Sequence, residues 1–576
     1  MKKKIVPVLT AGALILVIIL ILILSQIIEK YTPSKEHEEL TEYYNISSDD
    51  DVALILNHKV LEDKGKWIDD TIYLDIDTVQ NYLNSRFYWD SNENKLLYVT
   101  ANDLVSADAG SADYYVTKTK NTFSHTIVKV DTTTAYVALD FVAQYTNLTY
   151  EQLDDPNRVI LTSEFGDYET TNVKRNTQIR HKGGIKSPIV ADVTKGTTLT
   201  LLETGDTWSK VMTEDGIIGY IKNKMISGTT TATLTSDFTE EAHAHITKDF
   251  KINMGWHQVT NQTANSQVAS VISATKGLNV ISPTWFYLND NNGGIASLAS
   301  SEYVTYCHQN GVEVWALVSN LENSDVNTSE VLTYTSRRET LINNLISSAI
   351  QYNLDGINVD FESLNASEVG DSYIEFIREL SLKCANNGIV LSVDNYVPSD
   401  YTAFYDREEQ AAFADYIVIM AYDEHYAGSE EEGSVASIGF VTNGVTDTLK
   451  EVPASQTILG VPFYTRVWSL TPTEDSTESE DDSYVLYSLD SYAAGMKEVQ
   501  NLISANGAAA TWSDEDGQYY VEYENDGVTY KIWVEDATSI EEKLNVMKEN
   551  DLAGASFWKL GLEDSTIWDT IIKYIN

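Results

Sequence analysis

The feature that most limits the fold of this chain is a series of eight short apolar runs in residues 247–576, separated by amphipathic segments. The runs have the length and composition of strands, and the segments between them have helical periodicity. Strands alternating with helices form a parallel sheet, and eight such units predict a (β/α)8 (TIM) barrel, an α/β fold of about 250 residues. The predicted strands span residues 252–256, 278–285, 312–318, 356–362, 390–393, 416–422, 457–464 and 555–558.

The connection between the seventh and eighth predicted strands is longer than one helix requires. It contains an acidic, tyrosine-rich stretch at residues 469–537. We expect this stretch to form an α+β insertion in the barrel. Its most acidic run, residues 474–482, predicts a solvated loop rather than a binding site.

Two smaller blocks precede the barrel, and both predict β-rich domains. Residues 51–165 follow a polar linker at 31–50 and contain strand-like runs at 52–56, 72–76, 95–99, 127–130 and 159–161. Residues 171–230 form the second block. There, turn signals such as Gly205-Asp206 and Asp215-Gly216 separate runs of Val, Leu and Ile at the spacing of a small all-β barrel.

The first 30 residues predict a membrane anchor. Lys2, Lys3 and Lys4 precede an uncharged apolar run at residues 5–28. As a helix this run would reach about 36 Å, more than the hydrocarbon core of about 30 Å requires. A cleaved signal peptide is the alternative, but the run is long for one and no A-x-A-like site stands at its end, directly before Glu29. We expect a single-pass helix with the lysines in the cytoplasm and the rest of the chain outside the cell.

The charge of the chain argues against nucleic acid as a partner. There are 39 Lys and Arg residues against 86 Asp and Glu, a formal net charge of -47, whereas phosphate backbones are bound by clustered Lys and Arg. Cys307 and Cys384 lie in apolar helix-like runs, so we expect buried thiols and no disulfide framework. His243, His245 and His425 lack zinc-type spacing, and no metal or cofactor is predicted.

The fourth predicted strand carries the clearest catalytic pattern. Its sequence, LDGINVDFESL, places the apolar residues 357, 359 and 361 on one face and Asn358, Asp360 and Glu362 on the other. With the apolar face toward the helices, the polar face points into the barrel. A surface strand with an acidic face is the alternative. Burying two carboxylates is costly, so their place at the C-terminal mouth of a barrel strand favours a catalytic role.

The stretch from Asp355 to Glu362 resembles the DxxDxDxE motif of family 18 glycoside hydrolases. Two positions differ: Asn358 stands where chitinases usually carry Asp, and Ser363-Leu364 replaces the Tyr-Pro that often follows the acid. Because an amide can hydrogen-bond Asp360, we expect Asn358 to alter the pKa values of the carboxyl groups rather than to abolish activity.

Other strand ends carry the same resemblance, which spans nearly all of residues 247–576. The sequence VIMAYDEH matches the Met-x-Tyr-Asp of the family, and the tryptophan of GASFWKLGLED stands where the family keeps the aromatic floor of its -1 sugar site. The sequence GVPFYTRVW resembles the spore-cortex and cell-wall branch. The resemblance assigns substrate binding to Met420, Asp423, Tyr464, Arg466, Trp558, Trp285 and Asp355.

The resemblance also implies a mechanism, substrate-assisted hydrolysis with retention, in which the 2-acetamido oxygen of the substrate attacks the anomeric carbon. Glu362 would protonate the leaving oxygen and then activate water. Asp360 would orient the acetamido group and stabilise the oxazolinium charge, with Asn358 holding Asp360. Tyr422 would hydrogen-bond the acetamido oxygen.

The two smaller blocks carry resemblances of their own. Trp208, and Gly219-Tyr220-Ile221 near the end of the block, resemble a bacterial Src-homology-3-like domain. Members of that family often bind cell-wall peptides, and a plain spacer domain is the alternative. Residues 51–165 resemble the small domain at the N-terminus of copper amine oxidases and carry no copper-site motif.

Three functions agree with these patterns. The first is a membrane-anchored extracellular hydrolase that cleaves β-1,4 bonds of N-acetylglucosamine-containing glycan of the peptidoglycan or cortex type. The second is a chitinase acting on chitin or chito-oligosaccharides. The third is a non-catalytic carbohydrate-binding protein, although barrels of this family that became lectins usually lost the acid, and Glu362 is present. All three make a polysaccharide the expected partner.

Overall fold

The computed structural model describes residues 5–473 and 487–575, which form two compact units. Unit 1 contains the chain up to residue 89, residues 107–114 and residues 120–240. Unit 2 contains residues 90–106, 115–119 and the chain from residue 241. The predicted domain at 51–165 is therefore divided between the units. The lysines at positions 2–4 and the acidic run at 474–482 lie outside the described residues.

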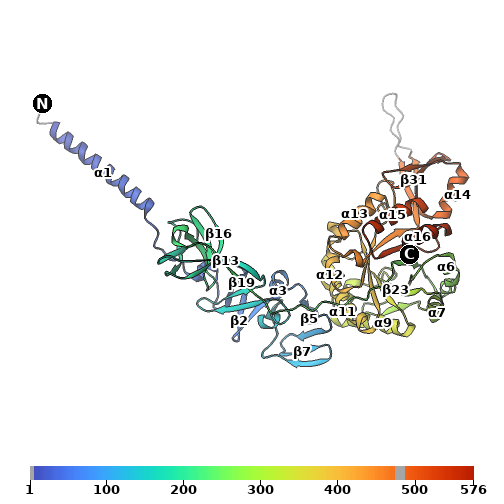
Figure 1. Ribbon diagram of the computed structural model, residues 1–576, viewed down its shortest axis with the longest axis horizontal. Helices are drawn as coiled ribbons and strands as arrows, with labels where there is room; N and C mark the ends of the chain where they lie inside the picture. The colour runs from blue at the N-terminus through green and yellow to red at the C-terminus, as the bar shows by residue number, and fades with distance from the viewer. Residues whose placement is uncertain (1–4, 474–486, 576) are drawn as a thin grey trace. The chain divides into compact units, whose positions relative to one another are not determined.

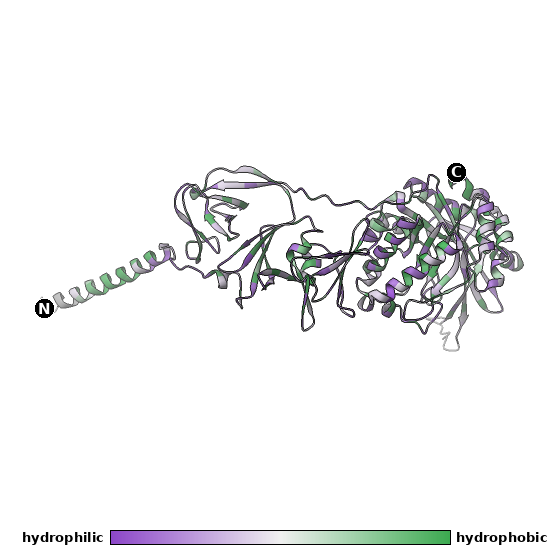
Figure 2. Cartoon of the chain, turned by 90° about the horizontal axis from the view of Figure 1, so that it is seen from below, coloured by the Kyte–Doolittle hydropathy of each residue, from purple (hydrophilic) through white to green (hydrophobic). Residues whose placement is uncertain are grey.

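A long apolar helix, α1, spans Ile5–Tyr31 (Figure 1). Figure 2 shows apolar residues along most of its length. The segment from Leu9 to Tyr31 is long and apolar enough to cross a membrane, and none of its most apolar window is buried inside the protein. A signal sequence passes the same test of length and composition.

The first sheet of unit 1 has seven strands in the order β11-β12-β1-β2-β3-β10-β9. Strands β1 and β12 are parallel, and the other neighbours are antiparallel. Asp75 caps helix α3 (Ile76–Tyr82) by accepting from the Thr78 amide at 2.9 Å. The strands are β1 (Asp51–Leu56), β2 (Lys59–Ile68), β3 (Thr71–Asp75), β9 (Val128–Asp131), β10 (Thr134–Ala138), β11 (Thr149–Leu153) and β12 (Arg158–Thr162).

The second sheet of unit 1 is antiparallel throughout, in the order β15-β14-β18-β17-β16-β13-β19. Its core contains Ile179, Leu199, Val211 and Ile221, all buried. The small all-β domain predicted in this block is confirmed. The strands are β13 (Gly166–Asn172), β14 (Thr177–Arg180), β15 (Ile189–Val193), β16 (Thr198–Thr204), β17 (Trp208–Met212), β18 (Ile218–Lys222) and β19 (Thr230–Leu234).

Unit 2 contains a closed ring of eight parallel strands, which confirms the predicted barrel. The ring closes because β20 pairs with both β21 and β33. In ring order the strands are β20 (Ile252–His257), β21 (Val280–Leu288), β23 (Glu313–Ser319), β24 (Gly356–Asp360), β25 (Val390–Tyr396), β26 (Tyr416–Met420), β27 (Thr457–Pro462) and β33 (Gly554–Trp558). Strand β24 ends before Glu362, and β25 continues past Val393 to Tyr396.

Helices surround this ring (Figure 1). They include α6 (Val268–Ala274), α7 (Ser301–Gln309), α9 (Thr335–Tyr352), α11 (Ser372–Asn387), α12 (Arg407–Phe413), α13 (Ile438–Thr448), α15 (Ala537–Glu549) and α16 (Trp568–Ile575). Apolar residues on the outer faces of the strands, such as Ile357 and Val359, form one core with the helices. The alternate residues, such as Met254 and Trp315, form a second cluster inside the ring.

An antiparallel sheet with one helix, α14 (Met496–Asn506), interrupts the barrel between β27 and β33. Its strand order is β29-β28-β32-β31-β30, and Val467, Val499 and Ile532 form its core. The insertion begins at Tyr464 rather than at residue 469. Its strands are β28 (Tyr464–Pro472), β29 (Tyr487–Gly495), β30 (Ala510–Ser513), β31 (Gln518–Asn525) and β32 (Val528–Val534).

A segment from the N-terminal half of the chain also belongs to unit 2. Strand β5 (Lys95–Val99) contacts helix α11, and Val99 packs against Leu382 and Phe413. Asp90 caps helix α9, because its Oδ2 accepts from the Thr335 amide at 2.7 Å and from the Thr335 hydroxyl at 2.6 Å. The neighbouring strands are β4 (Tyr88–Asp90), β6 (Leu104–Asp108), β7 (Asp113–Val116) and β8 (Thr119–Thr122).

Candidate active site

Asn358 lies inside the barrel, as the alternation of β24 predicts. The side chain is fully buried. Its Oδ1 accepts from Trp256 Nε1 on β20 and from Ser282 Oγ on β21, both at 3.0 Å. Its Nδ2 donates to Asp394 Oδ1 on β25 at 2.7 Å and to Ser392 Oγ at 3.1 Å. Four strands of the ring therefore meet at this amide.

Asp360, at the end of β24, is half-buried and lacks the contact that we expected from Asn358. Its Oδ1 has no hydrogen-bond partner among the described residues. Burial raises the pKa of Asp360 well above its usual value, and the charges of Asp394, Glu362 and Glu322 raise that pKa further. The expected bond is replaced because residues on the same face of one strand lie about 7 Å apart, whereas Asp394 on the next strand reaches the amide directly.

Glu362 follows β24 at the mouth of the barrel, and Asn320 holds its backbone. The Glu362 amide donates to Asn320 Oδ1, and Asn320 Nδ2 donates to the Glu362 carbonyl, both at 2.9 Å. The carboxylate accepts from the Tyr396 hydroxyl at 2.9 Å. Burial raises the pKa of Glu362, the Tyr396 bond opposes that rise, and the charges of Asp423 and Glu322 add to it. A raised pKa favours the protonated form of the carboxyl group, which can donate a proton.

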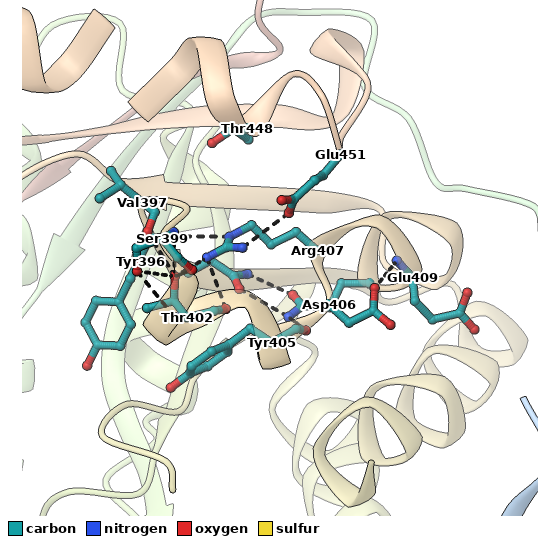
Figure 3. Close-up of polar contacts among 12 residues, drawn as sticks. Tyr396, Val397, Ser399, Thr402, Tyr405, Asp406, Arg407, Glu409, Thr448 and Glu451 are labelled. Atoms are coloured by element: carbon teal, nitrogen blue, oxygen red, sulfur yellow. Dashed lines mark hydrogen bonds and ion pairs between the residues drawn. The ribbon is translucent and has the colours of Figure 1, made fainter. Parts of the chain in front are cut away.

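The loop after β25 fixes Tyr396, and Arg407 fixes that loop (Figure 3). Arg407 Nε donates to the Tyr396 carbonyl at 3.4 Å, and Arg407 Nη2 donates to Thr402 Oγ1 at 2.6 Å. Arg407 Nη1 pairs with Glu451 at 3.2 Å. Within the loop, Ser399 and Thr402 form a reciprocal capping box. The guanidinium thus joins the loop to the chain after α13.

Tyr422 and Asp423 follow β26 at the same mouth. Their neighbour Met420, the last residue of β26, is buried. Asp423 has a left-handed backbone (φ 60°) and its carboxylate accepts from the Tyr464 hydroxyl. Burial raises the pKa of Asp423, while that hydrogen bond and the charge of Arg466 oppose the rise. The Tyr422 and Tyr464 rings meet edge to face at 6.4 Å.

Trp558 ends β33, where its half-buried indole meets the Trp256 ring edge to face at 5.9 Å. Trp256 also donates to Asn358, so Trp256 links Trp558 to the hydrogen bonds around the Asn358 amide. The role of Trp558 as the aromatic floor of a sugar site stays a prediction.

Two residues assigned to substrate binding lie elsewhere. Trp285 is fully buried between strand and helix layers, where its Nε1 donates to Asn265 Oδ1 at 2.9 Å and its ring packs on Tyr303. Asp355 precedes the first residue of β24, so it lies at the opposite end of the strand from Glu362. There it accepts from the Val314 amide and pairs with His308, both at 2.8 Å. Neither residue joins the carboxylates at the mouth.

Sequence reasoning missed two residues that contact this cluster, Asp394 and Tyr396. Both lie on β25, two residues apart, in the sequence SVDNY. The predicted fifth strand ends at Val393, so neither residue is assigned to it. On a strand extended to Tyr396, the period-2 rule that identified Asn358 and Asp360 would have placed Asp394 and Tyr396 on one face.

The cluster can donate a proton from Glu362, and it places a second carboxyl group, that of Asp360, two residues away. Its pKa shifts arise from burial and from other carboxylates, and hydrogen bonds oppose them. In residues 5–473 and 487–575, no group of three or more His, Cys, Asp or Glu side chains is placed to hold a metal ion. A proton-donating glutamate with a second carboxyl group two residues away is typical of acid catalysis at a sugar bond.

Comparison with known proteins identifies three domains. The model of glycosyl hydrolases family 18 matches residues 217–563, the model of the bacterial SH3 domain matches residues 175–227, and the model of the copper amine oxidase N-terminal domain matches residues 56–161. All three resemblances found in the sequence are thus confirmed.

Three curated relatives illustrate the range of the match. An uncharacterized glycosylase of Bacillus subtilis, YvbX, is 25% identical over 296 residues, which cover 49% of this chain and 81% of the relative. The cortical fragment-lytic enzyme of Bacillus subtilis is 26% identical, covering 44% of this chain and 58% of the enzyme. Chitinase A1 of Niallia circulans is 26% identical, covering 40% of this chain and 38% of the chitinase.

Proposed function

Because this chain belongs to glycosyl hydrolases family 18, we propose that it cleaves β-1,4 bonds of an N-acetylglucosamine-containing glycan of the peptidoglycan or spore-cortex type. The observation that carries this proposal is the pair Glu362 and Asp360 at the barrel mouth. Glu362 has a raised pKa and a hydrogen bond from Tyr396, and Asp360 lies two residues away on the inward face. One carboxyl group can donate a proton while the other stabilises positive charge.

The proposed chemistry is substrate-assisted hydrolysis with retention. Glu362 gives its proton to the glycosidic oxygen as the bond from that oxygen to the anomeric carbon breaks, and the 2-acetamido oxygen of the substrate bonds to the same carbon. Asp360 accepts from the acetamido N–H and stabilises the oxazolinium charge. Glu362 then removes a proton from water, which attacks the anomeric carbon and reopens the ring. Tyr422 positions the acetamido group, and Trp558 stacks beneath the sugar.

Three further residues at the mouth, Asp423, Tyr464 and Arg466, provide polar groups for the sugar. Asp423 and Tyr464 share a hydrogen bond, and Arg466 supplies a positive charge beside them. These groups suit the hydroxyl and carbonyl groups of a polar sugar rather than an apolar ligand.

One relative and one neighbouring domain favour wall or cortex glycan over chitin as the substrate. The cortical fragment-lytic enzyme is among the relatives, and a bacterial SH3 domain precedes the barrel. Chitin is the second candidate, since a relative of similar identity is named a chitinase. The SH3 domain is proposed to bind a wall peptide and so to hold the enzyme near its polymer.

We place the catalytic unit outside the cell, tethered by α1. The helix has the length and apolar surface of a membrane span, and residues 2–4 are lysines, which favour the cytoplasmic side. Cell fractionation, followed by protease treatment of intact cells, tests this orientation. Release of the chain with soluble proteins would contradict an uncleaved anchor.

The catalytic assignment is tested by Glu362→Gln in the full chain, held in detergent micelles. Removal of a general acid lowers kcat by about 10²–10⁴-fold. Hydrolysis of an N-acetylglucosaminide by parent and variant is the measurement. Equal rates, or no hydrolysis by the parent, would exclude the proposed reaction and favour a carbohydrate-binding role.

The substrate assignment is tested by digesting purified peptidoglycan, spore cortex and chitin in parallel. Mass spectrometry then identifies the products. Muropeptide fragments from peptidoglycan or cortex are expected. Release of chitobiose from chitin, with no fragments from the other two polymers, would replace the wall assignment by the chitin one.

A further inference from the structure

The orientation of the Asn358 amide is fixed by its neighbours. The indole N–H of Trp256 can only donate, so the amide oxygen must face it, at 3.0 Å. The NH₂ group therefore faces β25, where it donates to Asp394 Oδ1 at 2.7 Å. Asp394 must act as an acceptor in this pair. An aspartate at position 358 would instead bring two carboxylate oxygens to that distance, and they could coexist only by sharing a proton.

Strand register brings Asp394 to the level of Asp360. Val359 on β24 is paired with Val393 on β25, so the next residues along the two parallel strands are Asp360 and Asp394. Neighbouring strands lie about 4.8 Å apart, and both side chains are on the inward faces. Asp394 is 2% exposed. The barrel thus holds a second carboxyl group beside Asp360 although position 358 carries an amide.

We propose that Asp394 is a positioning residue of the glycosidase reaction: through Asn358 it supplies, from the next strand, the carboxyl group that the family motif places at position 358. The inference rests on the proposed function of Asp360. It assigns no contact with substrate to Asp394. Its role is to share one proton with Asp360, so that the two carboxyl groups carry a single charge when the acetamido group binds.

The surroundings of the two carboxyl groups agree with one shared charge. Burial raises the pKa of Asp394 to about 8, the bond from Asn358 opposes the rise, the charge of Glu362 adds to it, and the bond from Trp256 also opposes it. Asp360 faces Asp394, Glu362 and Glu322, and no lysine or arginine contributes to either shift among the described residues. Two buried carboxyl groups without a cation share a proton at neutral pH.

The test exchanges the two side chains in the full chain. Asp394→Asn keeps an acceptor for Asn358 and removes the ionisable group. The double variant Asn358→Asp/Asp394→Asn returns the carboxyl group to β24 and reverses the hydrogen bond. We expect Asp394→Asn to lower kcat by about 10- to 100-fold, with KM changed less than about threefold, and to shift the pH profile of kcat. The double variant should recover at least a tenth of the parent kcat and most of the profile.

Ser392→Ala provides the matched control, because Ser392 Oγ bonds the same Asn358 Nδ2 at 3.1 Å without carrying charge. A smaller loss of kcat and an unshifted pH profile are expected. A parent-like rate and profile for Asp394→Asn would overturn the proposal. So would a folded Asp394→Asn variant that loses activity without recovery in the double variant, because that result assigns Asp394 a packing role.

A second readout separates this inference from the proposed function. Infrared difference spectra between the full chain and its Asp394→Asn variant should contain, at neutral pH, the carbonyl band of one protonated carboxyl group. Glu362 and Glu375, whose pKa values are also raised, contribute equally to both proteins and cancel in the difference. The band does not require hydrolysis. A parent that hydrolyses no glycan but contains the band would contradict only the proposed reaction, and an active parent without the band would overturn the role of Asp394.

Discussion

In the helix layer of the barrel, the two buried glutamates Glu375 and Glu379 each have an arginine beside them. Arg338 donates to Glu379 at 2.9 Å, and Arg378 pairs with Glu375 at 3.2 Å and with Glu409 at 2.8 Å. At the mouth of the same barrel, Asp394 is buried and Asp360 and Glu362 are half-buried. Asp394 accepts from the Asn358 amide and Glu362 from the Tyr396 hydroxyl, and no lysine or arginine contributes to the pKa shifts of these three groups.

The difference shows how burial of acidic groups separates structure from chemistry in one domain. Burial raises the pKa of Glu375 to about 7, and the charge of Arg378 opposes the rise. Asp360, Glu362 and Asp394 have no such opposing cation, so their pKa values stay raised and favour protonated forms that a reaction can use. We therefore expect the carboxyl groups at the mouth to cost stability and the arginine pairs of the helix layer to preserve it. Each of the following variants tests that division.

The largest effect on stability is expected from Arg338→Met. The guanidinium is fully buried, and its loss leaves Glu379 without its partner. The free energy of unfolding of the barrel should fall by about 3–5 kcal/mol. The pKa of Glu379 is raised by burial and would rise further, so the loss should grow as pH increases through that pKa. Calorimetry at several pH values measures this change.

The double variant Arg338→Met/Glu379→Leu is the control for that prediction, since it removes both charges and should regain most of the lost stability. A single variant as stable as the parent would mean that the helix cluster does not support the fold.

A smaller change, of opposite sign, is expected in the stability of Glu362→Gln. The folded-state pKa of Glu362 is raised, so this carboxyl group costs stability as pH rises through that pKa. Glutamine cannot ionise, and the variant should be more stable than the parent by about 1 kcal/mol above neutral pH, with no gain below about pH 4. Thermal unfolding across this range provides the measurement. A less stable variant at alkaline pH would place Glu362 with the structural cluster.

Tyr396→Phe should affect the reaction more than the fold. Its hydroxyl bonds Glu362 and lowers the pKa of that carboxyl group, so its removal should shift the alkaline limb of the kcat/KM profile to higher pH. Loss of a hydrogen bond to a charged group corresponds to about a tenfold fall in kcat/KM. Tyr405→Phe is the control, because the Tyr405 hydroxyl donates to the Phe361 carbonyl at 3.2 Å instead. A limb that shifts equally in both variants would argue against a specific effect on Glu362.

The smallest effect is expected from Lys450→Met, in the turn that follows α13. Lys450 pairs with Asp447 at 2.6 Å, but the two side chains are 70% and 45% exposed. Such a pair contributes at most about 0.5 kcal/mol, and high salt should remove the contribution. Chemical denaturation at low and high salt measures it. A loss comparable to that of Arg338→Met would show that pairing, rather than burial, distinguishes the two clusters.

The sequence by itself determined the features that depend on local periodicity. The eight strand-like runs predicted the barrel, and the alternation along β24 placed Asn358 and Asp360 inward, because side chains on a strand alternate whatever the strand contacts. The apolar run at residues 5–28 likewise predicted the helix α1.

Only the tertiary structure decided which residues meet at the mouth. A register shift between Thr284 and Phe286 changes the alternation of β21, and Trp285 points into the layer of helices. Asp355 and Glu362 share one motif, yet a strand lies between them, so they occupy opposite ends of the barrel. Asp394 and Tyr396 reach Asn358 and Glu362 through the pairing of β24 with β25. The physical reason is that contacts between strands depend on register, which is set by the packing of the whole ring.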